Sequence, residues 1–389
     1  PMANLIFANL PTTIFEEMSG LARDLGAINL GQGFPDDPGP AAIRRKAAEE
    51  VLDGYNQYPP MAGLPELREA VANHYRRTQG LDLDWAREVT ITSGATEALA
   101  AAFLGLIQPG DEVVVFQPFY DAYLPLIRRA GGVPRLVTLQ PPHWRFDRAM
   151  LEAAFGPRTR FVVLNNPINP AGAVLPAEDL ALLAEACIAH DAVAICDEVW
   201  EQVIFDGARH VPLIALPGMR ERTVKIGSAG KMFGLTGWKV GFLCAGAGLT
   251  RALARTHQFL TFTTAPNLQA AVAWGLGRAG GWFEEMPAGL QRSRDRLAEG
   301  LRREGFATLP AQGTYFLNID LPASGVTEDD RSFALRAVKE AGVATIPVSA
   351  FYEQDHVRTI LRLCLAKADA TLDEGVARLA RARELSRAA

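Results

Sequence analysis

Lysine, cysteine and histidine are scarce in this chain of 389 residues, and each scarcity narrows what the protein can be. Only six of its 39 basic residues are lysine; the other 33 are arginine. The four cysteines form no C-x-x-C pair and lie in apolar segments, so we expect buried free thiols in a reducing compartment. The six histidines are scattered without H-E-x-x-H spacing, and no metal site is predicted.

Long apolar runs and blocks of like charge are also missing. The longest apolar stretches, such as 240–249, fall well short of the roughly 18 residues that a membrane-spanning helix needs. Segment 1–18 lacks a basic start followed by an apolar run, so we expect a cytoplasmic protein. The formal net charge of −5 is spread along the chain, which predicts neither a nucleic-acid nor a membrane partner.

From about residue 40, short β-branched runs alternate with amphipathic stretches. The runs at 161–164 and 193–195 are apolar without alternation, as in strands that are covered on both faces. Stretches such as 96–106 and 177–190 have the length that a helical crossover between parallel strands needs. The pattern predicts an α/β fold with a seven-stranded, mostly parallel sheet, its strands at 88–92, 112–116, 134–138, 160–164, 192–196, 223–226 and 240–244.

The pattern changes after Gly281. A long charged helix is predicted at 282–304, ending before Gly305. Beyond it, predicted strands at 314–319, 343–346 and 359–365 are interspersed with helices near 328–341 and from 372. We therefore assign residues 40–285 to a large domain, and residues 1–39 and 286–389 to a smaller α+β domain.

The usual phosphate-loop patterns fail here, but one segment is a candidate anion site. Gly227–Lys231 lacks two residues of a P-loop, and Arg251 replaces the third glycine of a dinucleotide-binding loop. Thr92–Glu97 lies where a strand ends and a helix begins, so the amides of its first turn and the Thr96 hydroxyl would face an anion. The alternative is an ordinary helix cap formed by Ser93.

Two residues after strands have the chemistry of a covalent cofactor site. Asp197 follows strand 192–196, and a buried carboxylate needs a cation such as a protonated ring nitrogen, unless it only caps the next helix. Lys231 lies among small residues, where burial would lower its pKa toward the state that forms a Schiff base. In a chain that prefers arginine, the cluster Lys225, Lys231 and Lys239 suggests a need for amines, with chance clustering as the alternative.

These segments make the chain resemble the class I, fold-type I, pyridoxal-phosphate-dependent aminotransferases, most closely the branch with kynurenine aminotransferase (glutamine transaminase K) and bacterial methionine aminotransferases. The resemblance implies that family's fold, a homodimer, amino-acid and 2-oxo-acid substrates, and pyridoxal 5′-phosphate (PLP) as cofactor. The motifs that carry it lie at 29–36, 55–58, 92–98, 165–172, 196–200, 228–241 and 359–367.

The resemblance also implies roles for single residues. Lys231 would hold the cofactor covalently and move the proton between substrate and cofactor, and Asp197 would pair with the pyridinium nitrogen. Lys225 has no counterpart role and is taken as a chance neighbour. The other implied cofactor contacts are the Ala95 and Thr96 amides, Ser228 and Lys239 at the phosphate, Tyr120 on the ring, Asn169 and Trp200 at O3′, and Tyr58 from the partner subunit.

For the substrate, the resemblance implies that Arg362 binds the α-carboxylate, a bidentate task suited to its planar guanidinium. Gly33 and Asn169 would assist. Phe15 and Phe262 would line the pocket, with Phe262, like Tyr58, contributed across the dimer interface.

Two departures from the family pattern affect substrate choice and cofactor chemistry. Trp200 replaces a usual tyrosine, and Thr263 stands where kynurenine-using members often have histidine. We predict ping-pong transfer from a neutral, aromatic or sulfur-containing L-amino acid (methionine, glutamine or kynurenine type) to a 2-oxo acid. The alternatives are a C–S β-lyase acting on cysteine conjugates or cystathionine, and an N-succinyldiaminopimelate aminotransferase. The physiological donor and acceptor stay open.

Overall fold

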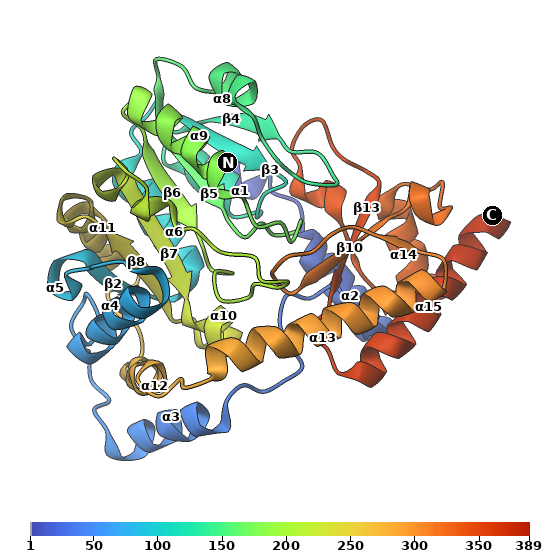
Figure 1. Cartoon of the computed structure of the whole chain (residues 1–389), viewed down its shortest axis with the longest axis horizontal. Coiled ribbons are helices and arrows are strands. Elements are labelled where there is room, and N and C mark those ends of the chain that lie inside the picture. Colours follow the sequence, from blue (N-terminus) through green and yellow to red (C-terminus); the bar gives the residue numbers. More distant parts are fainter. Residues whose placement is uncertain (1) are drawn as a thin grey trace.

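A twisted seven-stranded sheet forms the centre of the larger part of the molecule (Figure 1). The computed structural model describes residues 2–389. The strand order is β2-β8-β7-β6-β5-β3-β4, and only β8 runs antiparallel to its neighbours. The strands are β2 (Val89–Thr92), β3 (Glu112–Gln117), β4 (Val133–Thr138), β5 (Thr159–Asn165), β6 (Val193–Asp197), β7 (Thr223–Ser228) and β8 (Gly241–Ala245). The predicted sheet is confirmed, with strand ends at most two residues from those expected.

The central strands are buried on both faces, as their unbroken apolar runs predicted. In β3, Val113 and Val115 pack into one hydrophobic core, while Val114 and Phe116 pack into another on the opposite face. This division follows from the two-residue period of a strand. The sheet therefore needs helices on both sides, which the alternating sequence supplies.

Helices cover the sheet and link it to a second, smaller group of elements. Those of the larger part are α3 (Ala41–Asp53), α4 (Pro65–Gln79), α5 (Trp85–Glu88), α6 (Gly94–Leu106), α7 (Tyr123–Arg129), α8 (Arg148–Ala154), α9 (Ala177–Ala189), α10 (Ala229–Phe233), α11 (Ala247–Leu260) and α12 (Pro266–Leu276). The long α13 (Trp282–Arg303) then runs from the side of α10 and α12 toward the C-terminal helix (Figure 1). Gly305, just after it, has a φ of +85°, which favours glycine at a helix end.

The smaller group contains an antiparallel sheet in the order β12-β13-β10-β9. Its strands are β9 (Ala307–Thr308), β10 (Phe316–Asp320), β12 (Ile346–Pro347) and β13 (Ile360–Cys364), and its helices are α14 (Asp330–Glu340) and α15 (Asp369–Ala388). The predicted combination of a large α/β part with a smaller α+β part is confirmed. The domain limits at residues 40 and 285 stay a prediction.

The N-terminal segment packs with this smaller group. It forms α1 (Leu5–Ala8), α2 (Ile14–Leu25) and β1 (Ile28–Asn29), and β1 pairs with β11 (Val343–Ala344). All four cysteines are buried and free, as expected. Among the described residues, no helix has the length and apolar character needed to cross a membrane.

Candidate functional site

A cavity of about 210 Å³ lies where β5, β6 and β7 end and α6 begins. Ligands of α/β sheets bind at this edge, beyond the carboxyl ends of the strands. Nine residues that the sequence predicted for the site line it: Ala95, Thr96, Tyr120, Asn169, Asp197, Trp200, Ser228, Lys231 and Lys239. Segments up to about 140 residues apart in sequence thus meet at one point.

The first turn of α6 faces this cavity without a side-chain cap. Ser93 does not cap the helix, which corrects the alternative interpretation of this segment; its hydroxyl instead hydrogen-bonds Thr261 and Thr264 at 3.2 and 3.0 Å. Its amide donates to Glu97. The amides that follow, at the positive end of the helix dipole, remain available to an anion.

Two glycines let positively charged and donor groups converge beside this helix end. A Cβ at Gly94 would lie 2.8 Å from the ammonium of Lys239, so this amine packs directly against the start of α6. A Cβ at Gly241 would lie 2.6 Å from the Gly94 carbonyl carbon and 2.9 Å from the Ala95 amide nitrogen. Larger residues would therefore separate β8 and Lys239 from the helix end.

Asp197 is the last residue of β6 and is almost completely buried. The Tyr123 hydroxyl donates to its Oδ2 at 2.5 Å, and the Val199 amide donates weakly to Oδ1 at 3.4 Å. Burial raises the pKa of this carboxyl, while Tyr123, Val199 and Lys231 act in the opposite direction. A cationic partner in the cavity would stabilise the ionised form.

Lys231 extends from the short helix α10, whose start is capped by the Ser228 hydroxyl. Its Nζ donates to the Gly33 carbonyl at 3.1 Å and lies 4.7 Å from the centre of a Trp200 ring. Burial lowers the pKa of this amine to about 8, with smaller contributions of both signs from neighbouring groups. An amine with this pKa is partly neutral, and so nucleophilic, near pH 8.

Arg362, on β13, is buried between aromatic rings, and its guanidinium carbon lies 3.8 Å from the centre of the Phe316 ring. Phe15 and Phe351 lie farther away, at 5.2 and 5.3 Å. Its Nη2 donates to the Gly31 carbonyl at 2.7 Å, while its Nε has no partner among the described residues. A buried donor without a partner is costly, so this guanidinium is suited to accept an anionic ligand.

A continuous chain of hydrogen bonds joins Arg362 to the backbone of Asp197. Arg362 Nη1 donates to the side-chain Oδ1 of Asn169 at 2.9 Å, and the backbone N–H of Asn169 donates to Asn165 Oδ1 at 2.8 Å. Asn165 Nδ2 then donates to the Asp197 carbonyl at 2.9 Å. Arg362 in the smaller part is thereby linked to the backbone of the residue that carries the buried carboxylate in the larger part.

Trp200 packs edge-on against Tyr315 and Phe316, at centroid distances of 4.7 and 5.5 Å. Tyr120 lies on the α6 side of the cavity, with its hydroxyl 3.5 Å from that of Thr96. The Trp200 indole is thus held by contacts that fix its plane, whatever donor role its N–H has.

Tyr58 and Phe262 do not line the cavity of their own chain. They contact each other edge-on at 5.4 Å on the surface, where Tyr58 is 80% exposed and Phe262 38%. Further exposed apolar side chains, Leu52, Tyr55, Phe259 and Leu260, come from the helices and loops nearby. The predicted contribution of this pair to a partner subunit's site stays a prediction.

Sequence reasoning missed several residues that support the site. Tyr123, Asn165 and Tyr315 were not predicted, although Tyr123 follows Tyr120 by three residues and the Tyr315 hydroxyl donates to the Lys231 carbonyl. The spacing of the two tyrosines was the available signal for Tyr123. Nothing local marks Tyr315, because its contact with Lys231 spans 84 residues.

Comparisons with known proteins point to the class of enzyme that the sequence motifs resemble. The family model described as aminotransferase class I and II matches residues 26–379. A probable N-succinyldiaminopimelate aminotransferase of Mycobacterium tuberculosis is 44% identical over 379 residues, covering 95% of each chain. The methionine aminotransferase of Escherichia coli is 41% identical over 370 residues, covering 95% of this chain and 96% of the other.

Solved structures extend this similarity to the whole fold. That of N-succinyldiaminopimelate aminotransferase from Mycobacterium tuberculosis has a TM-score of 0.95 at 43% identity, covering 98% of this chain and all of the other. The Escherichia coli protein for which a methionine aminotransferase function was identified has a TM-score of 0.94 at 40% identity, with the same coverage.

Proposed function

The chain belongs to the class I and II aminotransferases, which use pyridoxal 5′-phosphate, and from this we propose a specific donor class and a role for each site residue. The enzyme takes amino groups from neutral, aromatic or sulfur-containing L-amino acids and gives them to a 2-oxo acid. The observation that carries the donor class is a groove that shares Phe15 and Phe351 with the surroundings of Arg362, and whose two lining arginines are already paired with glutamates.

The donors around the cavity fit PLP. The uncapped amides at the start of α6, with Ser228 and Lys239, suit its phosphate. The buried Asp197 carboxylate suits its pyridinium nitrogen, and Lys231 is the amine that would bind its aldehyde. When bound, PLP acts as an electron sink for the carbanion that forms at the substrate α-carbon.

The chain's own residues supply binding, orientation and proton transfer. Arg362 binds the substrate α-carboxylate and, through Asn169, is held in register with the cofactor site. Lys231, with its lowered pKa, would remove the proton from the substrate α-carbon and deliver it to the cofactor. Tyr120 would lie on the ring and Trp200 near its O3′, which would fix the orientation of the bond that loses its proton.

A groove of about 680 Å³, separated from Arg362 by two phenylalanine rings, supports the choice of neutral donors. Its apolar walls include Phe15 and Phe351, which also flank the Arg362 guanidinium. Two arginines reach it, Arg128 and Arg331, and each contacts both oxygens of a glutamate carboxylate at 3.0 Å or less. Because these guanidinium groups are already paired, the groove favours an uncharged side chain over a second carboxylate.

One observation favours a second candidate, N-succinyldiaminopimelate. The relative whose name includes this compound is slightly more similar to the chain, at 44% identity, than the methionine aminotransferase, at 41%. The distal carboxylates of this donor would have to displace Glu353 from Arg128 or Glu17 from Arg331. Both pairs lie at the surface, where an ion pair contributes at most about 1 kcal/mol, so breaking one to bind a substrate carboxylate would cost little free energy.

We also propose that the enzyme is a homodimer. The exposed pair Tyr58 and Phe262 would reach the partner's site, with the Tyr58 hydroxyl at the phosphate of the partner's cofactor. Exposed apolar residues around the pair would be covered in the same interface.

Single-turnover kinetics with a panel of amino donors tests the proposal. The PLP-loaded enzyme is mixed with methionine, glutamine, kynurenine, N-succinyl-L,L-diaminopimelate and aspartate, and the cofactor absorbance is followed. We expect a neutral or sulfur-containing donor to react at least roughly 10-fold more efficiently than aspartate, a difference of about 1.4 kcal/mol. A clear preference for N-succinyldiaminopimelate would select the second candidate, and a preference for aspartate would contradict both.

A further inference from the structure

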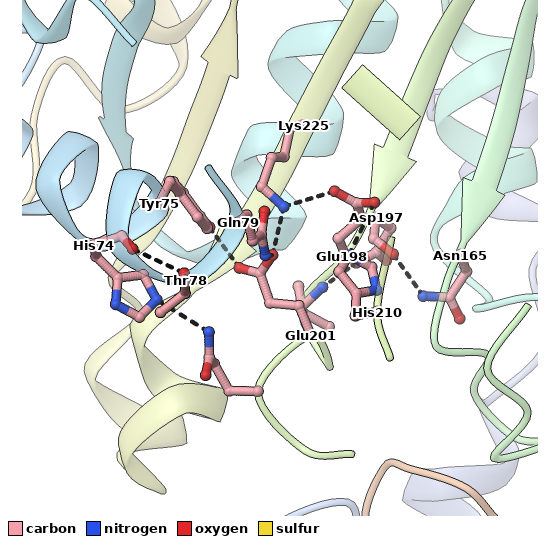
Figure 2. A network of polar contacts seen from close by, with 12 residues as sticks. His74, Tyr75, Thr78, Gln79, Asn165, Asp197, Glu198, Glu201, His210 and Lys225 are labelled. Carbon is pink, nitrogen blue, oxygen red and sulfur yellow. Dashed lines mark hydrogen bonds and ion pairs between the residues drawn. The ribbon is translucent and has the colours of Figure 1, made fainter. Parts of the chain in front are cut away.

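A network of buried charges (Figure 2) lies on the face of β6 and β7 opposite to the side chain of Asp197. At its centre is Lys225, which is completely buried. Its Nζ donates to Glu198 Oε1 at 2.7 Å and to Glu201 Oε2. Lys225 is paired in register with Cys196, whereas Asp197 points to the other face, because side chains alternate along a strand.

Other groups complete the network around the two glutamates. The Tyr75 hydroxyl donates to Glu201 Oε1 at 2.5 Å, and Gln79 Nε2 donates to Glu201 Oε2 at 2.8 Å. Nε2 of His210 lies 3.2 Å from Glu198 Oε2, within ion-pair distance, but neither atom has a hydrogen-bond partner among the described residues. Three of the four carboxylate oxygens therefore accept hydrogen bonds, and the network ties α4 to the segment after β6 (Figure 2).

The network holds its cation as part of the chain. Glu198, Glu201 and His210 offer ligand atoms within 4.8 Å of one another, a spacing that a metal ion could use. The Lys225 ammonium, however, already bridges the two carboxylates. Although burial opposes ionisation, Lys225 and then His210 lower the pKa of Glu198 to about 2, so the ion pair persists at neutral pH.

Burying three ionised groups costs several kcal/mol per ion before their attraction is counted, and an apolar cluster of similar volume is often as stable. A network of this kind is therefore weak evidence for stability and better evidence for a fixed geometry. The close packing agrees with this: a Cβ at Gly227 would lie 2.3 Å from the Tyr75 hydroxyl and 3.2 Å from Glu201 Oε1.

The geometry that the network fixes is that of the cofactor site. Glu198 and Glu201 bracket Trp200, and Glu198 directly follows Asp197. The Glu201 amide donates to the Glu198 carbonyl at 3.1 Å, which closes this segment into a turn. One face of the turn carries Asp197 and Trp200 into the cavity, and the other carries both glutamates to Lys225.

We propose that Lys225 is a positioning residue, whose ammonium clamps both ends of the Glu198–Glu201 turn and so fixes Asp197 and Trp200 against the cofactor. This inference rests on the proposed roles of Asp197 and Trp200. It gives a function to the lysine that sequence reasoning had taken as a chance neighbour of Lys231.

Two variants and a matched control test the clamp. Lys225→Met removes the ammonium but keeps an unbranched stem of similar length. The double variant Lys225→Met/Glu201→Gln removes one cation and one anion, so the network keeps its net charge. Arg145→Met is the control, because Arg145 pairs with the buried Asp179 through bonds of 2.9 and 2.7 Å, away from the cavity.

Three properties are measured for each protein: the thermal midpoint, the PLP dissociation constant, and the hydrogen-exchange rates of the Val199 and Trp200 amides in the apoprotein. We expect both Lys225 variants to bind PLP roughly 10-fold more weakly or worse. The loss is of the size seen in metalloproteins when a residue that orients a metal-binding side chain is removed. Exchange at the two amides should accelerate by a similar factor. In the double variant stability should recover while both defects persist, and Arg145→Met should change stability alone.

The clamp would be overturned if either Lys225 variant bound PLP and exchanged its Val199 and Trp200 amides as the wild-type protein does. It would also be overturned if PLP affinity and exchange recovered together with thermal stability in the double variant. If Lys225→Met does not fold, the charge-balanced variant decides. Failure of the wild-type protein to bind PLP would instead count against the proposed function, and exchange in the apoprotein would still test the clamp.

Discussion

The Tyr123 hydroxyl donates a hydrogen bond of 2.5 Å to Asp197 Oδ2, and both groups are buried. Asp197 has only one other donor among the described residues, the distant Val199 amide. Burial raises the pKa of the Asp197 carboxyl, and the hydrogen bond from Tyr123 is the main contact that lowers it. When no cation is next to Asp197, Tyr123 therefore contributes most to keeping the carboxylate ionised.

Tyr123→Phe should weaken the cofactor site without changing its shape. Loss of a hydrogen bond to a buried charge costs about 1.5–3 kcal/mol, so we expect PLP to bind at least about 10-fold more weakly. The acid limb of the pH profile of kcat/KM should move to higher pH, because the pKa of Asp197 rises further. Titration of PLP binding and steady-state rates against pH measure both effects.

Thr223→Val is the matched control for Tyr123→Phe. It also removes a buried hydroxyl donor, one that bonds the Met219 carbonyl away from the cavity. An acid limb that stays in place in Tyr123→Phe, or that moves equally in Thr223→Val, would contradict this role of Tyr123.

Capture of PLP by the apoenzyme should accelerate with pH and level off, with a midpoint near 8. The neutral amine is the nucleophile, and burial lowers the pKa of Lys231 to about 8 from an ordinary 10.5. Stopped-flow absorbance between pH 6.5 and 9.5 measures the rate. Lys231→Ala should abolish covalent capture and lower activity at least about 10⁴-fold, while Lys339→Ala, at an exposed site, should do neither.

The lowered pKa of Lys231 also determines how the stability of the apoprotein changes with pH. Because the folded-state pKa of Lys231 lies below the unfolded one, the unfolded chain binds the extra proton between pH 8 and 10.5. The cost of burying Lys231 is thus fully present below pH 8 and disappears as pH rises through this window. A capture midpoint near 10.5, or the opposite trend in stability, would show that burial does not shift this amine.

Sequence reasoning succeeded where the signal was local. The seven strands were predicted to within two residues because their apolar runs, such as 161–164, reflect burial on both faces. Residues next to strand ends, such as Asp197 and Lys231, were found because the carboxyl edge of a parallel sheet is a single place. Nine residues predicted around the cofactor line one cavity there, whereas Phe15, Gly33 and Arg362 are not among its lining residues.

It failed where the deciding contact is distant in sequence. Ser93 fits the pattern of a helix cap, but its hydroxyl bonds Thr261 and Thr264, which lie about 170 residues away. Lys225 was dismissed because its partners Glu198 and Glu201 are meaningful only once β6 and β7 lie side by side. The pairing of β1 with β11 spans most of the chain and has no local signature beyond two residues.

Arg362→Lys should impair substrate binding while leaving the cofactor site intact. The guanidinium bonds Asn169 and Gly31 and still has a free Nε, a set of donors that an ammonium cannot reproduce. We expect kcat/KM to fall about 10–100-fold, from the loss of charge-assisted hydrogen bonds of about 1.5–3 kcal/mol, with little change in PLP affinity. Steady-state kinetics with the best donor and PLP titration measure the two quantities.

Arg296→Lys serves as the control for this substitution, because Arg296 makes a two-bond contact with Asp373 at the surface. It should leave kcat/KM unchanged. Equal losses in both variants, or a loss of PLP affinity as large as the loss of kcat/KM in Arg362→Lys, would remove the assignment of Arg362 to the carboxylate.

Mixed dimers can show whether Tyr58 acts in its own subunit or in its partner's. Tyr58→Phe keeps the edge-on contact with Phe262 but removes the hydroxyl, and Lys231→Ala removes the reactive amine. If Tyr58 serves the partner, a dimer with one subunit of each kind has one site with both defects and one with none. Mixing the two weakly active variants, with unfolding and refolding to exchange subunits, should therefore restore activity.

The expected recovery is set by statistics. Equal amounts of the two variants give half mixed dimers at random assortment, and each mixed dimer has one intact site of two, so about a quarter of the wild-type activity should return. If Tyr58 acts within its own subunit, every site carries one defect and no activity returns. A mixture of Lys231→Ala with Asp197→Asn is the control, because both residues line the cavity of a single chain and cannot complement if each serves its own subunit's site. In that mixture a mixed dimer has two sites with one defect each, so recovery there would mean that subunits share more of the site than Tyr58.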